Sequence, residues 1–247
     1  MEIISVNNEI VKNTAKLLQK KYRQKNGKFI LEGYKAIKEA FDFGIEFDYV
    51  FVEKSVASNY NFLQCNIIET NSVILKKISD TENAPNAVGV AFQRECSLEI
   101  LKKSKKVVLL EGIKDAGNLG TILRSAVAFG ADAIVLFGDC VDLYNPKCVR
   151  SAVGNLWKIP VFHFQQVSEL EKYFGDFCRI ATLPRSDKLL KEFIPSDMML
   201  VMFGSEADGL SDKLIKYSTT SLKIEMNNNV ESLNLATSVS VIIYTLF

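Results

Sequence analysis

The second half of the chain alternates short, continuous apolar runs with segments in which apolar residues recur every three or four positions. The apolar runs occupy residues 107–110, 133–137, 159–164, 180–183, 199–203 and 221–224. Runs of this length, separated by helical segments, predict buried strands of a mostly parallel sheet with helices on both faces. The second half is therefore predicted to be an α/β domain, and ligands are expected at the carboxyl ends of its strands.

The first half repeats the alternation with a different spacing. Its predicted strands occupy residues 28–31, 48–52, 66–69 and 87–92, and helices are predicted at 34–43 and before residue 64. Residues 8–22 carry Ile10, Val11, Ala15 and Leu18 at helical spacing, which predicts an amphipathic helix.

These patterns divide the chain into two predicted domains. Residues 1–95 form a small α/β domain, residues 96–106 form a short lysine-rich linker without a core pattern, and residues 107–247 form the second domain. A length of 247 residues suits two domains, and 48% apolar with 24% charged residues is the composition of a globular protein.

Targeting and metal-binding patterns are not found. No apolar run approaches the roughly 18 residues of a membrane span, and the first residues lack the order of a signal peptide, so no membrane partner and a cytoplasmic location are expected. The five cysteines have no metal-binding spacing, which predicts reduced structural thiols and no metal. No GxGxxG follows a first strand, which argues against a dehydrogenase-like protein.

Basic residues are concentrated near the start of the chain although the net charge is only +1. Between residues 12 and 28 there are seven of them and no acidic residue: Lys12, Lys16, Lys20, Lys21, Arg23, Lys25 and Lys28. On the solvated face of a helix such side chains can contact RNA phosphates, and Lys12, Lys16, Lys20, Lys21 and Arg23 are the candidates. The same pattern is also typical of a helix face that only keeps the protein in solution.

Polar and glycine residues accumulate in three loops that follow predicted strands, at residues 111–120, 204–209 and 225–233. In the first, Asn118 and Gly120 precede Arg124, so a helix N-terminus close to a guanidinium could bind a phosphate. Alternatively, Asn118 only caps the helix and Arg124 pairs with an acidic neighbour. A tight turn explains the glycines of the second loop but not Glu206. In the third, Ser232 could be only an N-cap.

In order and spacing, these loops resemble the three motifs of the SpoU (TrmH-like) branch of the SPOUT RNA methyltransferases. The matching cores are Asn-x-Gly-x-x-x-Arg at 118–124, Gly-Ser-Glu at 204–206 and Glu-Ser-Leu-Asn at 231–234. The first half resembles the substrate-binding domain often attached to this family, which is similar to RNA-binding ribosomal proteins. Its best-matching run is Phe-Ile-Leu-Glu-Gly at 29–33.

The resemblance implies transfer of a methyl group from S-adenosylmethionine to a ribose 2'-hydroxyl of structured RNA. It also implies a SPOUT α/β-knot fold, in which the C-terminal segment forms a trefoil knot, and a homodimer whose sites lie near the subunit interface. An N-terminal domain extends the contact area, which favours ribosomal RNA over transfer RNA. The alternative is a catalytically impaired RNA-binding protein that keeps the knotted fold.

Carried over to this sequence, the resemblance makes Arg124 the catalytic arginine. Asn118 and Glu206 then position it and the substrate, and Ser232 and Asn234 complete the polar side of the pocket. Cofactor contacts are implied for the second and third loops at Gly204, Ile224, Met226 and Leu233. A free guanidinium stays protonated at neutral pH, so Arg124 is expected to act with a substrate phosphate or to stabilise developing alkoxide charge, and not to act alone as a base.

The sequence departs from the family pattern at four loop positions. Ala116 and Glu225 stand where proline is usual, and Ala207 and Asn228 stand where glycine is common. None of these changes removes a catalytic side chain. Glu225 is expected to place a charge beside the adenine site. Together with Asn228, it is expected to weaken cofactor binding. The single histidine, His163, lies outside the motifs and is interpreted as structural.

Overall fold

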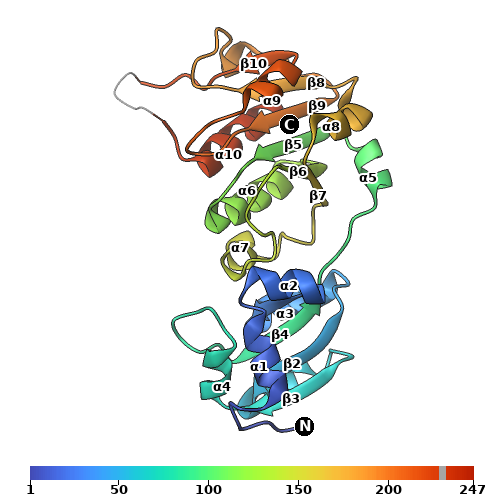
Figure 1. Cartoon of the computed structure of the whole chain (residues 1–247), viewed down its shortest axis with the longest axis vertical. Helices are drawn as coiled ribbons and strands as arrows, with labels where there is room; N and C mark the ends of the chain where they lie inside the picture. Colours follow the sequence, from blue (N-terminus) through green and yellow to red (C-terminus); the bar gives the residue numbers. More distant parts are fainter. Residues whose placement is uncertain (228–231) are drawn as a thin grey trace. The chain divides into compact units, whose positions relative to one another are not determined.

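The computed structural model describes residues 1–227 and 232–247 of the chain (Figure 1). Their contacts form two compact units. Unit 1 combines Met1–Glu95 with Asp142–Trp157, and unit 2 combines Cys96–Val141 with Lys158–Phe247. Residues 142–157 thus belong to unit 1 by their contacts, although in sequence they lie between two strands of unit 2.

Unit 1 is built on a mixed sheet of four strands in the order β1-β4-β2-β3. The strands are β1 (Lys28–Glu32), β2 (Phe47–Glu53), β3 (Asn66–Thr70) and β4 (Ala87–Phe92). Strand β4 runs antiparallel to β1 and β2, whereas β3 is parallel to β2. The accompanying helices are α1 (Glu9–Lys16), α2 (Lys20–Asn26), α3 (Tyr34–Asp42), α4 (Ser72–Lys77) and α7 (Pro146–Ala152). All four predicted strands of the first half are confirmed.

Two helix predictions in the first half are wrong. The single helix expected at residues 8–22 is broken between α1 and α2. At this corner the Arg23 guanidinium donates to the carbonyls of Leu17 and Leu18, at 2.8 and 2.9 Å. These bonds satisfy carbonyls at the corner, which an unbroken helix would pair with its own N–H groups. The helix expected before residue 64 is the 3-10 helix η1 (Lys54–Tyr60).

Unit 2 is built on a sheet of six parallel strands in the order β10-β8-β9-β5-β6-β7. They are β5 (Lys106–Glu111), β6 (Ala133–Phe137), β7 (Val161–Phe164), β8 (Cys178–Thr182), β9 (Met199–Phe203) and β10 (Thr220–Leu222). Each predicted apolar run of the second half overlaps one of these strands, so the parallel α/β sheet is confirmed.

Helices cover both faces of this sheet. They are α5 (Leu98–Lys103), α6 (Ala116–Ala128), α8 (Val167–Phe174), α9 (Asp212–Tyr217) and α10 (Leu235–Leu246), together with the 3-10 helix η2 (Leu190–Glu192). One core cluster joins Leu109 and Met202 of the sheet to Phe174 of α8 and Leu214 of α9. Helices α6 and α10 pack against each other (Figure 1). Among the described residues, no helix is long and apolar enough to span a bilayer.

Candidate active site

Strand register brings the loops of unit 2 to one edge of the sheet. Strands β5 and β9 are parallel neighbours in which Leu110 is aligned with Phe203. Their following loops, at residues 112–115 and 204–211, therefore emerge side by side, as expected at the carboxyl edge of a parallel sheet. The loop that follows β10 leads to α10, which packs on α6. The three polar segments thus meet although they are far apart in sequence.

Three of the predicted site residues are joined by hydrogen bonds. The amide of Asn118 donates to Glu206 Oε1 at 2.6 Å, and the amide of Asn234 donates to Asn118 Oδ1 at 3.1 Å. The bond to Glu206 is charge-assisted and correspondingly strong. One side chain from each of the three family motifs therefore takes part in a single network, which fixes the start of α6 against the loop after β9 and the start of α10.

The residues that cap helices α6 and α10 are not the ones that the sequence suggested, Asn118 and Ser232. Asp115 caps α6 by accepting from the Asn118 N–H at 2.7 Å, so Asn118 lies in the first turn and is free to use its side chain elsewhere. Asn234 caps α10 by accepting from the N–H groups of Ala236 and Thr237. The readings of Asn118 and Ser232 as simple N-caps are therefore wrong. Their roles pass to acidic and amide side chains a few residues away.

Arg124 lies on the exposed side of α6, six positions beyond Asn118. Within residues 1–227 and 232–247, its guanidinium makes no hydrogen bond or ion pair, so it does not pair with an acidic neighbour. Neighbouring helix positions are buried at Ile122 and Leu123, which fixes the direction in which the arginine projects. A charge held on a rigid helix and left without a partner is available to a group outside the chain.

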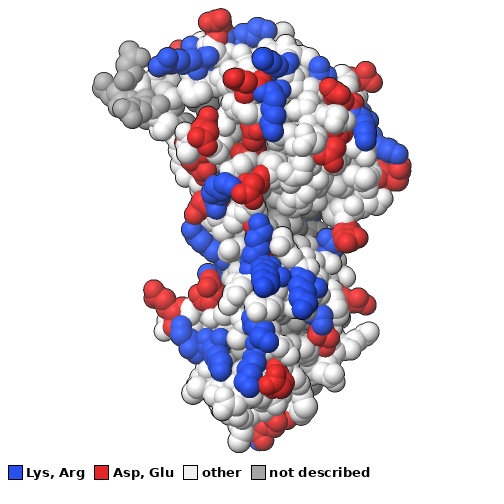
Figure 2. Space-filling view, viewed as in Figure 1, with Lys and Arg blue, Asp and Glu red and all other residues white. Residues whose placement is uncertain are grey.

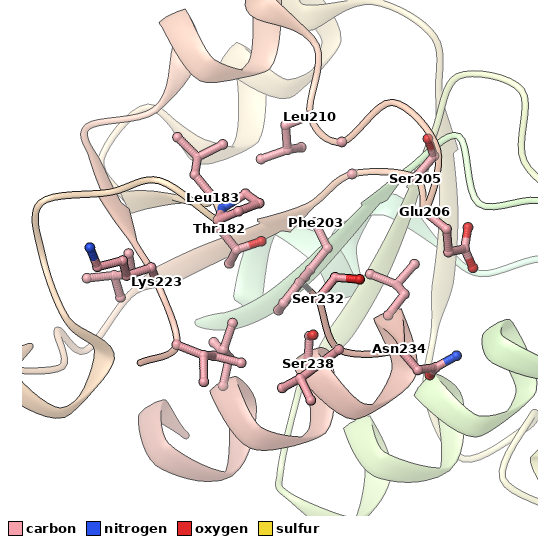
Figure 3. A pocket seen from close by; sticks show the side chains of 18 of the residues that line it. Thr182, Leu183, Phe203, Ser205, Glu206, Leu210, Lys223, Ser232, Asn234 and Ser238 are labelled. Atoms are coloured by element: carbon pink, nitrogen blue, oxygen red, sulfur yellow. The ribbon is translucent and has the colours of Figure 1, made fainter. Parts of the chain in front are cut away.

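A cavity of about 620 Å³ lies beside this network. Its wall is apolar at Leu183, Phe203, Leu210, Leu222, Ile224 and Ile242, and polar groups enter from Thr182, Ser205, Glu206, Ser232, Asn234 and Ser238 (Figure 3). All four predicted cofactor residues, Gly204, Ile224, Met226 and Leu233, line it. Arg124 and Asn118 do not line this cavity of their own chain.

The loop after β9 requires glycine at its first position. A Cβ atom on Gly204 would lie 1.9 Å from the carbonyl carbon of Gly209 and 2.1 Å from the Leu210 nitrogen. The loop folds back because the Gly209 N–H donates to the Ser205 carbonyl at 3.0 Å, with Gly209 at a φ of 69°. Gly204 is thus a condition for the closed turn that carries Glu206 and forms one wall of the cavity.

Glu111 is a further organising residue that the motifs did not single out. It ends β5, and its carboxylate accepts from both the N–H and the hydroxyl of Ser211, each at 2.7 Å. This two-point attachment ties the far end of the loop after β9 to the neighbouring strand. A carboxylate placed directly after a buried strand was the available sequence signal.

Glu225 has a partner of its own. Its carboxylate forms an ion pair with Lys191 of η2, and it is absent from the described residues that line the cavity, whereas its neighbours Ile224 and Met226 are present. The Glu225 charge is therefore paired within the chain, and its effect on the adenine site stays a prediction. Asn228 and Glu231 lie outside the described residues.

Four of the five predicted RNA-binding side chains are exposed. Lys12, Lys16, Lys20 and Lys21 are exposed, and Figure 2 shows Lys and Arg side chains gathered over α1 and α2. Arg23, in contrast, is only 1% exposed and pairs with Asp142 at 2.6 Å. Its assignment to the RNA-binding surface is wrong, because its charge is used inside unit 1.

No group of three or more histidine, cysteine, aspartate or glutamate side chains with metal-binding geometry occurs in the part of the chain that the structure describes. The polar groups that line the cavity are the hydroxyls of Thr182, Ser205, Ser232 and Ser238, the amide of Asn234, the carboxylates of Glu206 and Asp208, and the amine of Lys223. Such groups can orient a polar substrate and stabilise developing negative charge.

Comparison with known proteins places these features in a family. Residues 105–244 match the SpoU rRNA Methylase family, and residues 8–89 match the MRM3-like substrate binding domain. An uncharacterised tRNA/rRNA methyltransferase of Synechocystis is 32% identical over 98% of this chain and 92% of its own length. The 23S rRNA (guanosine(2553)-2'-O)-methyltransferase RlmP of Bacillus subtilis is 28% identical over 99% of this chain and 98% of its own.

Solved structures agree with this assignment. An rRNA methyltransferase from Sinorhizobium meliloti, determined with bound AdoMet, superposes with a TM-score of 0.89 and 26% identity over 99% of this chain and 96% of that one. The resemblance inferred from the three motifs is confirmed, and the chain belongs to the SpoU rRNA methylase family.

Proposed function

We propose that this protein transfers a methyl group from S-adenosylmethionine to a ribose 2'-hydroxyl of structured RNA, with ribosomal RNA favoured over transfer RNA. The observation that carries the proposal is the hydrogen-bond network of Asn118, Glu206 and Asn234. It joins all three family motifs beside a cavity and leaves Arg124 without a partner among the described residues. The family and the relatives that act on 23S rRNA support the choice of RNA.

The cavity fits S-adenosylmethionine. Its volume of about 620 Å³ is within the usual range of roughly 300–1,000 Å³ for small-molecule sites, and it combines apolar walls with a few polar groups. Gly204, Ile224, Met226 and Leu233 would hold the cofactor, with Gly204 permitting the tight turn that forms one wall of the cavity. When bound, the cofactor supplies an electrophilic methyl group. The related S. meliloti structure with AdoMet supports this assignment.

The chain's own residues must orient the ribose and help its hydroxyl to lose a proton. A guanidinium stays charged at neutral pH, so Arg124 acts by stabilising alkoxide charge or by holding a substrate phosphate that assists proton removal. Glu206 and Asn118 keep α6, and with it Arg124, in a fixed position relative to the cavity. Ser232 and Asn234 add polar groups at the cavity edge.

The proposal includes the larger architecture implied by the family. In it, residues 1–95 are the RNA substrate-binding domain, 96–106 the linker and 107–247 the methyltransferase domain with a C-terminal trefoil knot. By their contacts, residues 96–106 group with unit 2 and residues 142–157 with unit 1. Two chains form a homodimer in which Arg124 approaches the partner's cofactor, and the protein acts in the cytoplasm. The position of Arg124 outside the cavity of its own chain supports a site completed by a second copy.

Calorimetric titration of the full-length protein with S-adenosylmethionine is the first test, followed by transfer of a labelled methyl group to ribosomal RNA from a strain that lacks the gene. Micromolar binding with 2'-O-methylation at one nucleotide is expected. A protein that binds RNA but no S-adenosylmethionine, with or without RNA present, would instead be the catalytically impaired RNA-binding protein.

A further inference from the structure

Unit 1 contains a second cavity, of about 430 Å³, beside α1 and α2. Ile10, Leu17 and Tyr49 supply apolar surface in it, and the ring of Tyr22 is half-buried at its side. The Tyr49 ring is held in place, because its hydroxyl lies 2.9 Å from Thr14 Oγ1, which already donates its own hydrogen to the Ile10 carbonyl. The cavity thus has a fixed apolar floor and an aromatic side wall.

The charged side chains that line this cavity are basic. Lys16, Lys25 and Lys28 line it, and none of the residues described as lining it is acidic. Lys28 pairs with Asp48, but Lys25 is exposed and forms no ion pair with any residue that the structure describes. Lys16 lies 5.9 Å from the centre of the Tyr22 ring and Lys21 lies 6.0 Å from it. An anion is therefore attracted to the rim next to an aromatic ring.

Two amide side chains complete the lining. Asn13 uses its oxygen to accept from Lys16 at 3.0 Å, and Asn26 uses its nitrogen to donate to the Tyr22 carbonyl at 2.8 Å. The NH₂ group of Asn13 and the oxygen of Asn26 are left for other partners. One donor and one acceptor are the groups needed to pair with the edge of a nucleobase.

We propose that this cavity binds one unstacked nucleotide of a single-stranded RNA segment, with its base on Tyr22 and its phosphate at Lys16 and Lys25. The inference rests on the proposed function, because it takes RNA as the substrate. The proposal adds a contact to one RNA base to the exposed lysines of α1 and α2, which by charge alone would contact only phosphates. A base inside a helix cannot reach an aromatic side wall, so the occupant comes from a loop, a bulge or an end.

Arg23 explains why the cavity exists. Its guanidinium holds the carbonyls of Leu17 and Leu18 and so fixes the corner between α1 and α2, which lies next to Tyr22. A continuous helix over residues 8–22 would not leave this corner. Arg23 is therefore unsuitable for testing the site, whereas Tyr22 and Lys25 can be changed with less effect on folding.

The test measures RNA binding by the full-length protein with a fluorescein-labelled, mixed-sequence single-stranded RNA of ten nucleotides. Tyr22→Ala is expected to weaken binding about tenfold or more, and Tyr22→Trp to restore it, because base stacking on an aromatic ring carries the contact. The slope of log K against log salt should stay unchanged in both variants. Lys25→Ala should lower that slope by about 0.7, as expected when one contact to a single-strand phosphate is lost.

Lys35→Ala serves as the matched control, because Lys35 is an exposed lysine of unit 1 on α3, with no ion pair in the described ranges. It should leave both affinity and slope close to those of the unmodified protein. Melting curves confirm that each variant is folded. Two results would overturn the nucleotide site: unchanged RNA affinity in a folded Tyr22→Ala variant, or equal effects of Lys25→Ala and Lys35→Ala. Methylation of ribosomal RNA by the unmodified protein would still support the proposed function in either case. An unmodified protein that does not bind this short RNA would also overturn the nucleotide site, whereas the proposed function is overturned only by a protein that transfers no methyl group to ribosomal RNA.

Discussion

At the residue scale, the site is defined by which side chains are already satisfied within the chain and which are not. Asn118, Glu206 and Asn234 satisfy one another, whereas Arg124 is exposed and without a partner among residues 1–227 and 232–247. Because an exposed arginine contributes little to folding, its substitution should affect chemistry and not stability. Replacing Asn118, Glu206 or Asn234 by alanine should affect both activity and stability.

Replacing Arg124 tests this difference directly. Arg124→Ala is expected to lower methyl transfer by a factor of about 100 or more while the melting temperature and the dissociation constant for S-adenosylmethionine stay the same, because the guanidinium stabilises charge only during reaction. Arg124→Lys keeps the charge but loses the planar donor geometry, so it should restore little of the rate. Steady-state kinetics beside calorimetry provides the measurement. Full activity of Arg124→Ala would contradict the assigned role.

Asn234 has two tasks that substitution can separate. Its Oδ1 caps α10, and its Nδ2 donates to Asn118 at 3.1 Å. Asn234→Ala should lose both and reduce the free energy of unfolding by about 1 kcal/mol. Asn234→Ser keeps a good capping oxygen but cannot reach Asn118, so it should melt like the unmodified protein and still lose activity. Equal activity of Asn234→Ser and the unmodified protein would show that only the cap matters.

At the scale of elements, the loop after β9 connects the network to the cavity and depends on contacts at both of its ends. Gly204 permits the turn at one end, and Glu111 of β5 holds Ser211 at the other. The loop therefore depends on the pairing of β5 with β9. A change in a side chain outside the cavity can then alter the cavity wall.

Glu111→Ala is expected to weaken S-adenosylmethionine binding and to lower the free energy of unfolding by about 1.5–3 kcal/mol, because it removes two hydrogen bonds to a charged acceptor. Ser211→Ala is the matched control. It removes only the hydroxyl bond and keeps the N–H bond, and the Ser211 side chain does not cap α9. Its effect on both quantities should be smaller. Calorimetry and thermal melts measure them, and a Glu111→Ala variant with normal affinity would separate the loop from cofactor binding.

Elements differ in how far the sequence could predict them. Strands β4, β6 and β9 coincide with their apolar runs, because burial on both faces leaves an uninterrupted signal. The break between α1 and α2 was not predictable from periodicity, because it depends on bonds from Arg23 to two carbonyls. The site motifs gave Asn118 and Glu206, but their mutual bond joins residues that only the sheet brings together.

At the scale of the whole molecule, unit 1 combines residues that are far apart in sequence. Asp142 lies in the part of the chain that matches the SpoU family, yet it belongs by its contacts to unit 1 and pairs there with Arg23. In the same unit, Arg150 pairs with Glu32 at 3.2 Å and with Asp80 at 2.8 Å. Unit 1 therefore includes residues 142–157, which follow strands β5 and β6 of unit 2 in the sequence.

The buried pair gives a prediction about the stability of unit 1. The side chains of Arg23 and Asp142 are 2% and 11% exposed, so removing one partner leaves the other charge buried without compensation. Arg23→Ala should reduce the free energy of unfolding by about 3–5 kcal/mol, whereas Lys12→Ala, at an exposed position, should have little effect. Denaturant unfolding measures both.

A second pair of variants distinguishes a structural role of Arg23 in its ion pair with Asp142 from a role in RNA binding. Asp142→Asn leaves every exposed lysine of α1 and α2 in place, yet it removes the charge that faces Arg23 at 2.6 Å. If Arg23 acts inside unit 1, Asp142→Asn should destabilise the protein as Arg23→Ala does, because an uncompensated guanidinium remains buried. If Arg23 acted on RNA instead, Arg23→Ala would be as stable as the unmodified protein and would lower only the salt dependence of RNA binding. Unfolding curves and RNA titrations of the same two variants therefore decide between a structural and an RNA-binding arginine.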